Sequence, residues 1–211
     1  GPQPALEGNL PWPKQKAELV QGGKKVMWVL VLILAYLLGS IPTAYVVGRY
    51  IYKFDIRSRG SGNVGASNTL RTMGTVPGLI VLAIDVFKGL LAVWLGLAAG
   101  GLPLGALAAL LAIIGHNWSI FLDFRGGKGV ATAAGAVLAM APVVLFWAAL
   151  IWITVILLSR YISLGSLIAV AVTPFLMLFY HCPWPYVFYT FAGAVLIIYQ
   201  HRSNIKRLLE G

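Results

Sequence analysis

Four short polar segments carry the residues of this sequence that could do chemistry. The first, residues 61–71, reads Ser-Gly-Asn-Val-Gly-Ala-Ser-Asn-Thr-Leu-Arg. A glycine-rich backbone can direct several N–H groups at a phosphate, and the Ser, Asn and Arg side chains supply further donors. The pattern G-x-G-x-x-G at 60–65 lacks the buried strand that a dinucleotide-binding fingerprint needs, because the residues before it are charged. The segment therefore predicts a phosphate-binding loop.

The second segment, residues 115–129, ends in Gly-Gly-Lys-Gly at the start of an apolar helix. Gly126 and Gly127 allow a backbone nest for phosphate, Lys128 provides a countercharge, and the dipole of the following helix adds to both. The segment is not a Walker A loop, which would need Gly at Leu122 and Ser or Thr at Gly129. It predicts a second anion site.

Two further polar segments follow apolar runs. Residues 159–166 read Ser-Arg-Tyr-Ile-Ser-Leu-Gly-Ser, a short turn rich in hydroxyl groups. Residues 201–207 read His-Arg-Ser-Asn-Ile-Lys-Arg, directly after the last apolar run. On a helix, His201 and Asn204 share a face, so both side chains can point at one ligand.

The rest of the chain has the composition of a membrane protein. Of its 211 residues, 59% are hydrophobic and only 10% are charged, far from the averages of soluble domains. The net charge of +10 lies in short turns between apolar runs, which favours anionic lipids and phosphorylated substrates over nucleic acid. The single cysteine, Cys182, excludes an intramolecular disulfide. We expect no metal site and no cofactor.

Long apolar runs connected by short loops predict an all-α, polytopic helical bundle in the membrane. Splitting the longest run at Ala141-Pro142 gives seven transmembrane helices. Eleven of the sixteen Lys and Arg residues fall in the four polar segments and their flanks. The four segments lie on one side of the membrane only if every apolar run crosses it. The positive-inside rule makes that side cytoplasmic, with the N-terminus outside and the C-terminus inside. The expected helices are 26–48, 76–99, 102–115, 129–141, 142–158, 162–180 and 186–200.

Two other features bear on the domain organisation. Residues 1–23 begin Gly-Pro and are polar, so we interpret them as a cleavage scar and linker, with residues 24–211 as one membrane domain. Asp85 and Lys88 lie three positions apart inside an expected span. Charges at that depth must be paired or face a polar cavity. We interpret them as a structural ion pair, with a role in supporting the active site as the alternative.

The four polar segments together resemble the bacterial acyl-phosphate:glycerol-3-phosphate acyltransferases, the PlsY family. The resemblance lies in Ser-Gly-Asn-Val-Gly-Ala-Ser-Asn-Thr-Leu-Arg at 61–71, Gly-His-x-x-x-x-Phe-x-x-Phe-x-Gly-Gly-Lys-Gly-Val-Ala-Thr at 115–132, Tyr-Ile-Ser-Leu-Gly-Ser at 161–166 and His-x-x-Asn-Ile-x-Arg-Leu at 201–208. It covers the chain from about Val26 to the C-terminus. One departure is Ser119, where the family pattern has Pro.

The resemblance implies transfer of an acyl group from acyl phosphate to the sn-1 hydroxyl of glycerol 3-phosphate. The products are lysophosphatidic acid and phosphate, the reaction belongs to phospholipid biosynthesis, and the expected location is the inner (cytoplasmic) membrane with the active site facing the cytoplasm. We expect His201 to orient the hydroxyl or take its proton. For the glycerol phosphate we expect Arg71, Lys128 and Asn204, and for the acyl phosphate Ser61, Asn68, Thr69, Gly126, Gly127 and Ser166.

Several alternatives follow from the same residues. No G-x-S-x-G elbow occurs, so direct attack by the glycerol hydroxyl is expected instead of an acyl-serine intermediate. A substrate phosphate could serve as the base in place of His201. The rival function is an organophosphate or anion transporter, but internal repeats and broken helices at mid-membrane are absent from the pattern. A structural membrane adaptor leaves the phosphate-binding loops unexplained.

Overall fold

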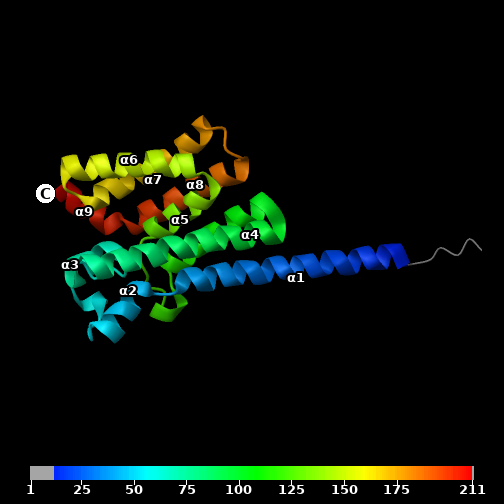
Figure 1. Ribbon diagram of the computed structural model, residues 1–211, viewed down its shortest axis with the longest axis horizontal. Coiled ribbons are helices and arrows are strands. Elements are labelled where there is room, and N and C mark those ends of the chain that lie inside the picture. The colour runs from blue at the N-terminus through cyan, green and yellow to red at the C-terminus, as the bar shows by residue number, and fades with distance from the viewer. Residues whose placement is uncertain (1–11, 211) are drawn as a thin grey trace, which may run out of the picture.

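The computed structural model describes residues 12–210, and within that range the regular elements are all helical (Figure 1). By length and composition, four of the described helices could cross a membrane, and one of these, α4, is folded on itself. The longer elements are α1 (Trp12–Ser40), α4 (Thr75–Asn117), α5 (Val130–Met140), α6 (Pro142–Ser159), α7 (Ile162–Phe179) and α8 (Trp184–Gln200). The shorter ones are α2 (Thr43–Val46), η1 (Val47–Ile51), η2 (Ile56–Ser58), α3 (Ala66–Met73), η3 (Ile120–Leu122) and α9 (Arg202–Glu210).

Helix α4 turns back on itself at two glycines. Gly100 and Gly101 leave the helical region, and Gly101 has a φ of 72°, which favours a residue without a Cβ. Gly96 and Gly105 face each other across this bend so closely that a Cβ on Gly96 would lie 2.6 Å from the Gly105 Cα. The two arms of α4 are the two apolar segments expected on either side of residue 100.

The remaining breaks also fall at proline or at left-handed residues. Helix α1 ends at Ser40, just before Pro42, and α6 starts with Pro142 at its first position. Arg160, with a φ of 62°, separates α6 from α7. These are positions where a continuing helix would lose a hydrogen bond or strain the backbone.

The first helix begins earlier than the sequence predicts. Helix α1 starts at Trp12, inside the segment interpreted as a linker, while residues 1–11 lie outside the described part of the chain. At its other end the helix stops at Ser40 instead of continuing to Gly48. The chain resumes as α2 and a π-helical turn, η1, so the single helix expected over residues 26–48 is broken at Pro42.

A buried ion pair stabilises that break. The Lys88 ammonium lies 2.9 Å from the Asp85 carboxylate and donates to the Ile41 carbonyl at 3.1 Å, while the Thr43 hydroxyl donates to Asp85 at 3.2 Å. Both charged side chains are almost completely buried. Since Ile41 and Thr43 flank Pro42, the pair fixes α2 against α4, which agrees with the structural interpretation of Asp85 and Lys88.

Small residues bring the helices into close contact. A Cβ on Gly39 would overlap the Ala112 carbonyl oxygen, and one on Gly135 would overlap the Val86 carbonyl oxygen. These contacts place α1 and α5 directly against α4. Such packing by small residues is expected in a membrane, where the hydrophobic effect does not drive helices together. In Figure 1, α5 to α8 gather on one side of α4, and α1 runs along the other.

The bundle has two chemically different ends. At one end lie α3 and α9 with the basic segments, and at the other lie the bend of α4 and the connection from α7 to α8 (Figure 1). An apolar core inside the bundle packs residues from α4, α5, α6, α7 and α8. Its buried members include Val93, Ile113, Val137, Val144, Met177, Tyr186, Tyr189 and Ile197.

Candidate active site

A single cavity of about 1010 Å³ extends from the basic end into the bundle. Helices α3 to α9 all contribute to its walls. Its mouth is polar and is lined by Ser61, Ser67, Arg71, Lys128, Arg160, Ser163, Ser166, His201, Asn204 and Arg207. Its inner part lies between α5, α6, α7 and α8 and is lined mainly by apolar residues, among them Val137, Leu145, Ala148, Val170, Gly193 and Ile197.

Lys128 and Asn204 meet at the mouth. The Lys128 ammonium donates a hydrogen bond to the side-chain oxygen of Asn204, which joins the loop before α5 to α9. Burial, together with the nearby positive charges of Arg207 and Arg71, lowers the pKa of Lys128 to about 8. Three cations thus converge on one place, and an anion bound there would relieve their mutual repulsion.

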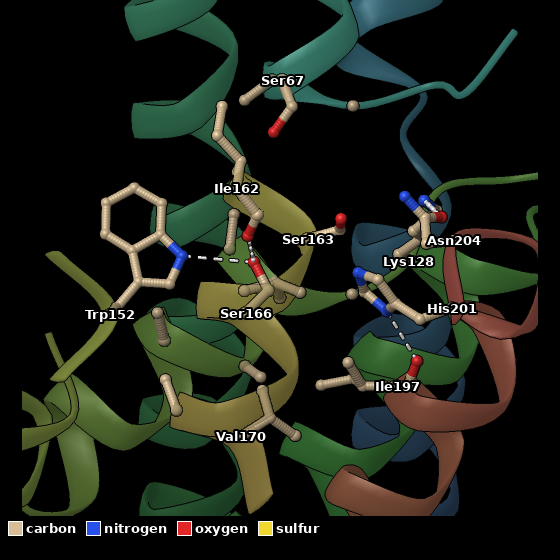
Figure 2. A pocket seen from close by; sticks show the side chains of 18 of the residues that line it. Ser67, Lys128, Trp152, Ile162, Ser163, Ser166, Val170, Ile197, His201 and Asn204 are labelled. Carbon is tan, nitrogen blue, oxygen red and sulfur yellow. Dashed lines mark hydrogen bonds between the residues drawn. The ribbon is translucent and has the colours of Figure 1, made fainter. Parts of the chain in front are cut away.

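His201 lies beside this pair with a defined tautomer. Its ring is buried, and Nδ1 lies 2.8 Å from the carbonyl oxygen of Ile197 (Figure 2). A carbonyl can only accept, so the proton of the neutral ring is on Nδ1 and Nε2 keeps its lone pair. Burial and the positive charge of Lys128 lower the pKa of His201 to about 4, against a raising effect of the bond to Ile197. His201 is therefore neutral at pH 7 and presents an acceptor.

The start of α5 is a second place for an anion. Gly129, with a φ of 83°, precedes the helix, and no side chain caps the first turn. Lys128, Gly129, Val130 and Ala131 all line the cavity. The uncapped amides of a helix N-terminus carry a partial positive charge, which adds to that of the Lys128 ammonium.

Gly126 and Gly127 do not line this cavity, and their part in a phosphate cradle stays a prediction. Their N–H groups donate to the carbonyls of Asn117 at 3.1 Å and His116 at 2.9 Å. Helix α4 ends at Asn117 and leaves these carbonyls open, so the two glycines satisfy them. A Cβ on Gly127 would overlap the His116 ring, so close packing explains this glycine better than contact with a phosphate does.

The first polar segment divides into supporting residues and residues that face the cavity. Asn68 is buried and bonds within its own loop: its side chain accepts from Ser61 N and donates to the carbonyls of Arg59 and Asn63. Thr69 is fully buried, donates to the Gly65 carbonyl at 3.0 Å and does not line the cavity. These bonds make Asn68 and Thr69 supports for the loop. Ser61, Asn68 and Arg71 line the cavity, whereas Thr69 does not, and contact of these residues with substrate stays a prediction.

Ser166 lies on α7 on the opposite wall. Its hydroxyl donates to the Ile162 carbonyl at 3.0 Å and accepts from the Trp152 indole at 3.2 Å (Figure 2). The bond to Trp152 fixes α7 against α6 at the point where the polar mouth meets the apolar part of the cavity. Ser166 is thus held rigidly at that boundary.

Sequence reasoning missed several residues that line the mouth. Figure 2 shows Ser67, Trp152 and Ser163 around the same space as Lys128, His201 and Asn204. Arg207 was open to prediction, because it follows Asn204 by three positions on one helix face. Trp152 was not, because nothing in its apolar run distinguishes it from a residue that faces lipid.

The cavity has cationic residues at its mouth and an apolar interior. Among its described lining residues, Arg71, Lys128, Arg160 and Arg207 are cationic, and the carboxylates are those of Asp85 and Glu210. Asp85 is paired with Lys88, and Glu210 lies 3.7 Å from Lys206. The mouth is thus suited to phosphate groups, and the inner part to a hydrocarbon chain.

The sequence matches a known family along most of its length. The family model described as glycerol-3-phosphate acyltransferase matches residues 29–211. Glycerol-3-phosphate acyltransferase 2 of Moorella thermoacetica is 70% identical over 185 residues, covering 88% of this chain and 95% of that protein. The glycerol-3-phosphate acyltransferase of Desulforudis audaxviator is 44% identical over 183 residues, with coverages of 87% and 92%.

The fold agrees with that match. The crystal structure of PlsY, an integral membrane glycerol 3-phosphate acyltransferase, in its glycerol 3-phosphate form is similar with a TM-score of 0.84 and 36% identity. The lysophosphatidic acid form of that protein gives a TM-score of 0.81. In both comparisons the likeness covers 87% of this chain and 92% of the other. The chain belongs to the glycerol-3-phosphate acyltransferase family of integral membrane proteins.

Proposed function

We propose that this protein transfers an acyl group from acyl phosphate to the sn-1 hydroxyl of glycerol 3-phosphate, in phospholipid biosynthesis. The observation that carries the proposal is the continuity of one cavity, cationic at its mouth and apolar inside. Both substrates have a phosphate for the mouth, and the donor and product also have a hydrocarbon chain for the interior. Membership of the family and the two forms of the similar structure support the same reaction.

The step we propose is direct transfer. The sn-1 oxygen attacks the acyl carbonyl carbon, the bond from that carbon to the phosphate oxygen breaks, and phosphate leaves with the electron pair. The products are lysophosphatidic acid and inorganic phosphate. The N-terminal amides of α5 stabilise the negative charge that moves onto the leaving phosphate, and the positive charge of Lys128, which binds the neighbouring phosphate, adds to their effect.

His201 orients the attacking hydroxyl in this proposal. Its Nε2 accepts a hydrogen bond, because Nδ1 donates to Ile197. A pKa of about 4 makes the ring a weak base at neutral pH. The leaving phosphate takes the electron pair of the broken bond and is the better acceptor for the proton. We therefore propose that His201 positions the attacking hydroxyl and that the leaving phosphate accepts its proton.

The remaining residues follow from their place in the cavity. We assign Arg71, Lys128 and Asn204 to the phosphate of glycerol 3-phosphate, and Ser61, Ser166 and the start of α5 to the acyl phosphate. Asn68, Thr69, Gly126 and Gly127 shape the loops that carry these groups. The transporter alternative gains no support, because the Lys and Arg residues that line the cavity come from the basic segments at one end of the bundle.

We further propose seven spans, with the cavity mouth at the cytoplasmic face of the inner membrane. The spans are α1, the two arms of α4, and α5 to α8. The support is charge: the basic segments around α3 and α9 lie at one end of the bundle, and positive loops favour the cytoplasm.

Single introduced cysteines in a Cys182→Ser background test this topology with a membrane-impermeant thiol reagent. We expect labelling from outside at Pro103→Cys and Pro183→Cys, and labelling only from inside at Ser61→Cys and at Arg125→Cys in the second loop. Labelling from the other side at either pair would refute the orientation.

The donor is tested by offering purified protein radiolabelled glycerol 3-phosphate with acyl phosphate, acyl-CoA or acyl carrier protein thioester. Lysophosphatidic acid from acyl phosphate alone is the expected result. A comparable yield from either thioester would refute the proposed donor, and no product from any of the three would refute the activity.

A further inference from the structure

Tyr189 occupies the inner end of the cavity in an unusual state. Its side chain is 2% exposed, it lines the cavity, and its hydroxyl has no hydrogen-bond partner among the described residues. A buried hydroxyl without a partner is unfavourable, so native proteins retain few of them. The position therefore needs an explanation other than packing alone.

The cavity runs along α8 from the site to this tyrosine. Tyr189, Gly193, Ile197 and His201 all line it, at intervals of four residues along one side of the helix. Twelve positions separate Tyr189 from His201, which at the rise of an α-helix is about 18 Å. Half of the hydrocarbon thickness of a bilayer, the depth of one layer of lipid chains, is about 15 Å. The distance is thus comparable to the length of one membrane acyl chain.

Gly193 keeps this path open. A Cβ there would touch only the Ile113 Cδ1 atom, at 3.4 Å, with no other atom within 4 Å. Gly193 itself therefore places no side chain in the stretch between Ile197 and Tyr189, where the other lining residues of α8 are Thr190 and Ala194.

The cavity lining on α8 does not extend past Tyr189. Tyr186, Val187 and Met177 are buried with it in one apolar cluster and do not line the cavity. A hydrocarbon chain that reached further would have to displace them. It would also press its methyl end on a hydroxyl that already lacks a partner, and so exclude any water that could serve it.

We propose that Tyr189 sets the upper limit of acyl-chain length in this protein. The inference rests on the proposed function, since it assumes that the donor's acyl chain lies in this cavity. The ring limits the depth, and the unpartnered hydroxyl disfavours contact with a chain terminus. Chains that end short of Tyr189 are accepted, and chains that would reach past it are rejected.

The test is a competition among saturated acyl phosphates whose lengths rise by two carbons, with the product lengths measured by mass spectrometry. In Tyr189→Ala the ratio of the first longer product to the wild-type optimum should rise about tenfold or more, the scale on which a pocket discriminates a methylene group. Tyr189→Phe removes only the hydroxyl and should give a smaller rise. Gly193→Val narrows the middle of the path and should move the optimum to shorter chains.

Tyr186→Ala is the matched control, because Tyr186 is a buried tyrosine of the same helix and cluster that does not line the cavity. Its length ratio should stay that of the wild type. Wild-type ratios in Tyr189→Phe and Gly193→Val would overturn the proposal even if Tyr189→Ala failed to fold. A wild-type rate that shows no optimum in acyl-chain length would also overturn the proposal. Absence of lysophosphatidic acid from every acyl phosphate would instead refute the proposed function, and this inference with it.

Discussion

The ammonium group of Lys128 donates a hydrogen bond to the side-chain oxygen of Asn204, across 76 positions of the sequence. The bond joins the loop before α5 to α9, and His201 lies one helical turn before Asn204. The bond fixes the ammonium group at the mouth of the cavity, which reduces the reorganisation that binding of a phosphate requires.

Removing the charge of Lys128 should be severe. Lys128→Met keeps most of the side-chain length and removes the donor, and we expect kcat/KM to fall by about 10² to 10³, the usual loss for one donor at a developing charge. The assay is steady-state formation of lysophosphatidic acid. Lys206→Met is the control, because Lys206 is exposed and pairs only with Glu210, and it should retain near-wild-type activity. Equal activities in the two variants would remove Lys128 from the site.

The pH dependence of kcat/KM should report the same lysine. Burial holds the pKa of Lys128 at about 8, so the ammonium form is lost as the pH rises through that value. We expect kcat/KM for glycerol 3-phosphate to fall about tenfold per unit above pH 8, since this parameter reports the free enzyme. Lys128→Arg should move that limb to higher pH, because a guanidinium stays charged. If the fall in kcat/KM stayed at the same pH in Lys128→Arg, the titration would belong to another group.

His201 should act mainly on binding. If it positions the hydroxyl, His201→Ala should raise the KM for glycerol 3-phosphate about tenfold, the scale of one hydrogen bond, with a smaller change in kcat. His201→Gln, which retains an acceptor, should recover part of the loss. A fall in kcat of about 10² to 10⁴ with an unchanged KM would make the ring a general base instead. Unchanged kinetics in both His201→Ala and Asn204→Ala would reduce the C-terminal segment to a solvated tail.

Gly127 should matter for folding more than for substrate binding. A Cβ at this position overlaps the His116 ring, and such overpacking costs about 1–3 kcal/mol. Gly127→Ala should lower the thermal stability of the purified protein, while the double variant with His116→Ala should regain part of it. Gly22→Ala is the control, because a Cβ there meets no atom within 4 Å. A stable Gly127→Ala protein with a raised KM would return this glycine to the phosphate site.

The sequence predicted which side chains would gather, because polar segments that leave the membrane on the same side must lie near one another. The structure brings Ser61, Arg71, Lys128, Ser166, His201 and Asn204 to one cavity. The sequence could not predict where the backbone donors point. The amides of Gly126 and Gly127 donate to the end of α4, because that helix leaves two carbonyls without an intrahelical partner there. This contact depends on the tertiary structure and has no local sequence signal.

Helix boundaries were also only partly predictable from the sequence. Proline and glycine predicted the breaks at residues 100–101 and at Ala141, since these residues limit the backbone locally. The break at Pro42 was not predicted, because residues 26–48 were expected as one helix. The early start of α1 was missed although Pro13 stands in its first turn, where proline is tolerated. The π-helical turn of η1 depends on packing and not on a local signal.

Direct transfer from acyl phosphate is tested most directly by rapid-quench measurement of both products in a single turnover. Wild-type protein, acyl phosphate and glycerol 3-phosphate should give lysophosphatidic acid and inorganic phosphate in equal amounts and at the same rate. Leaving out glycerol 3-phosphate should reduce phosphate release to that of a blank without protein. A burst of phosphate without glycerol 3-phosphate would show an acyl-enzyme intermediate and contradict direct transfer. Lysophosphatidic acid formed without release of an equal amount of phosphate would contradict acyl phosphate as the donor.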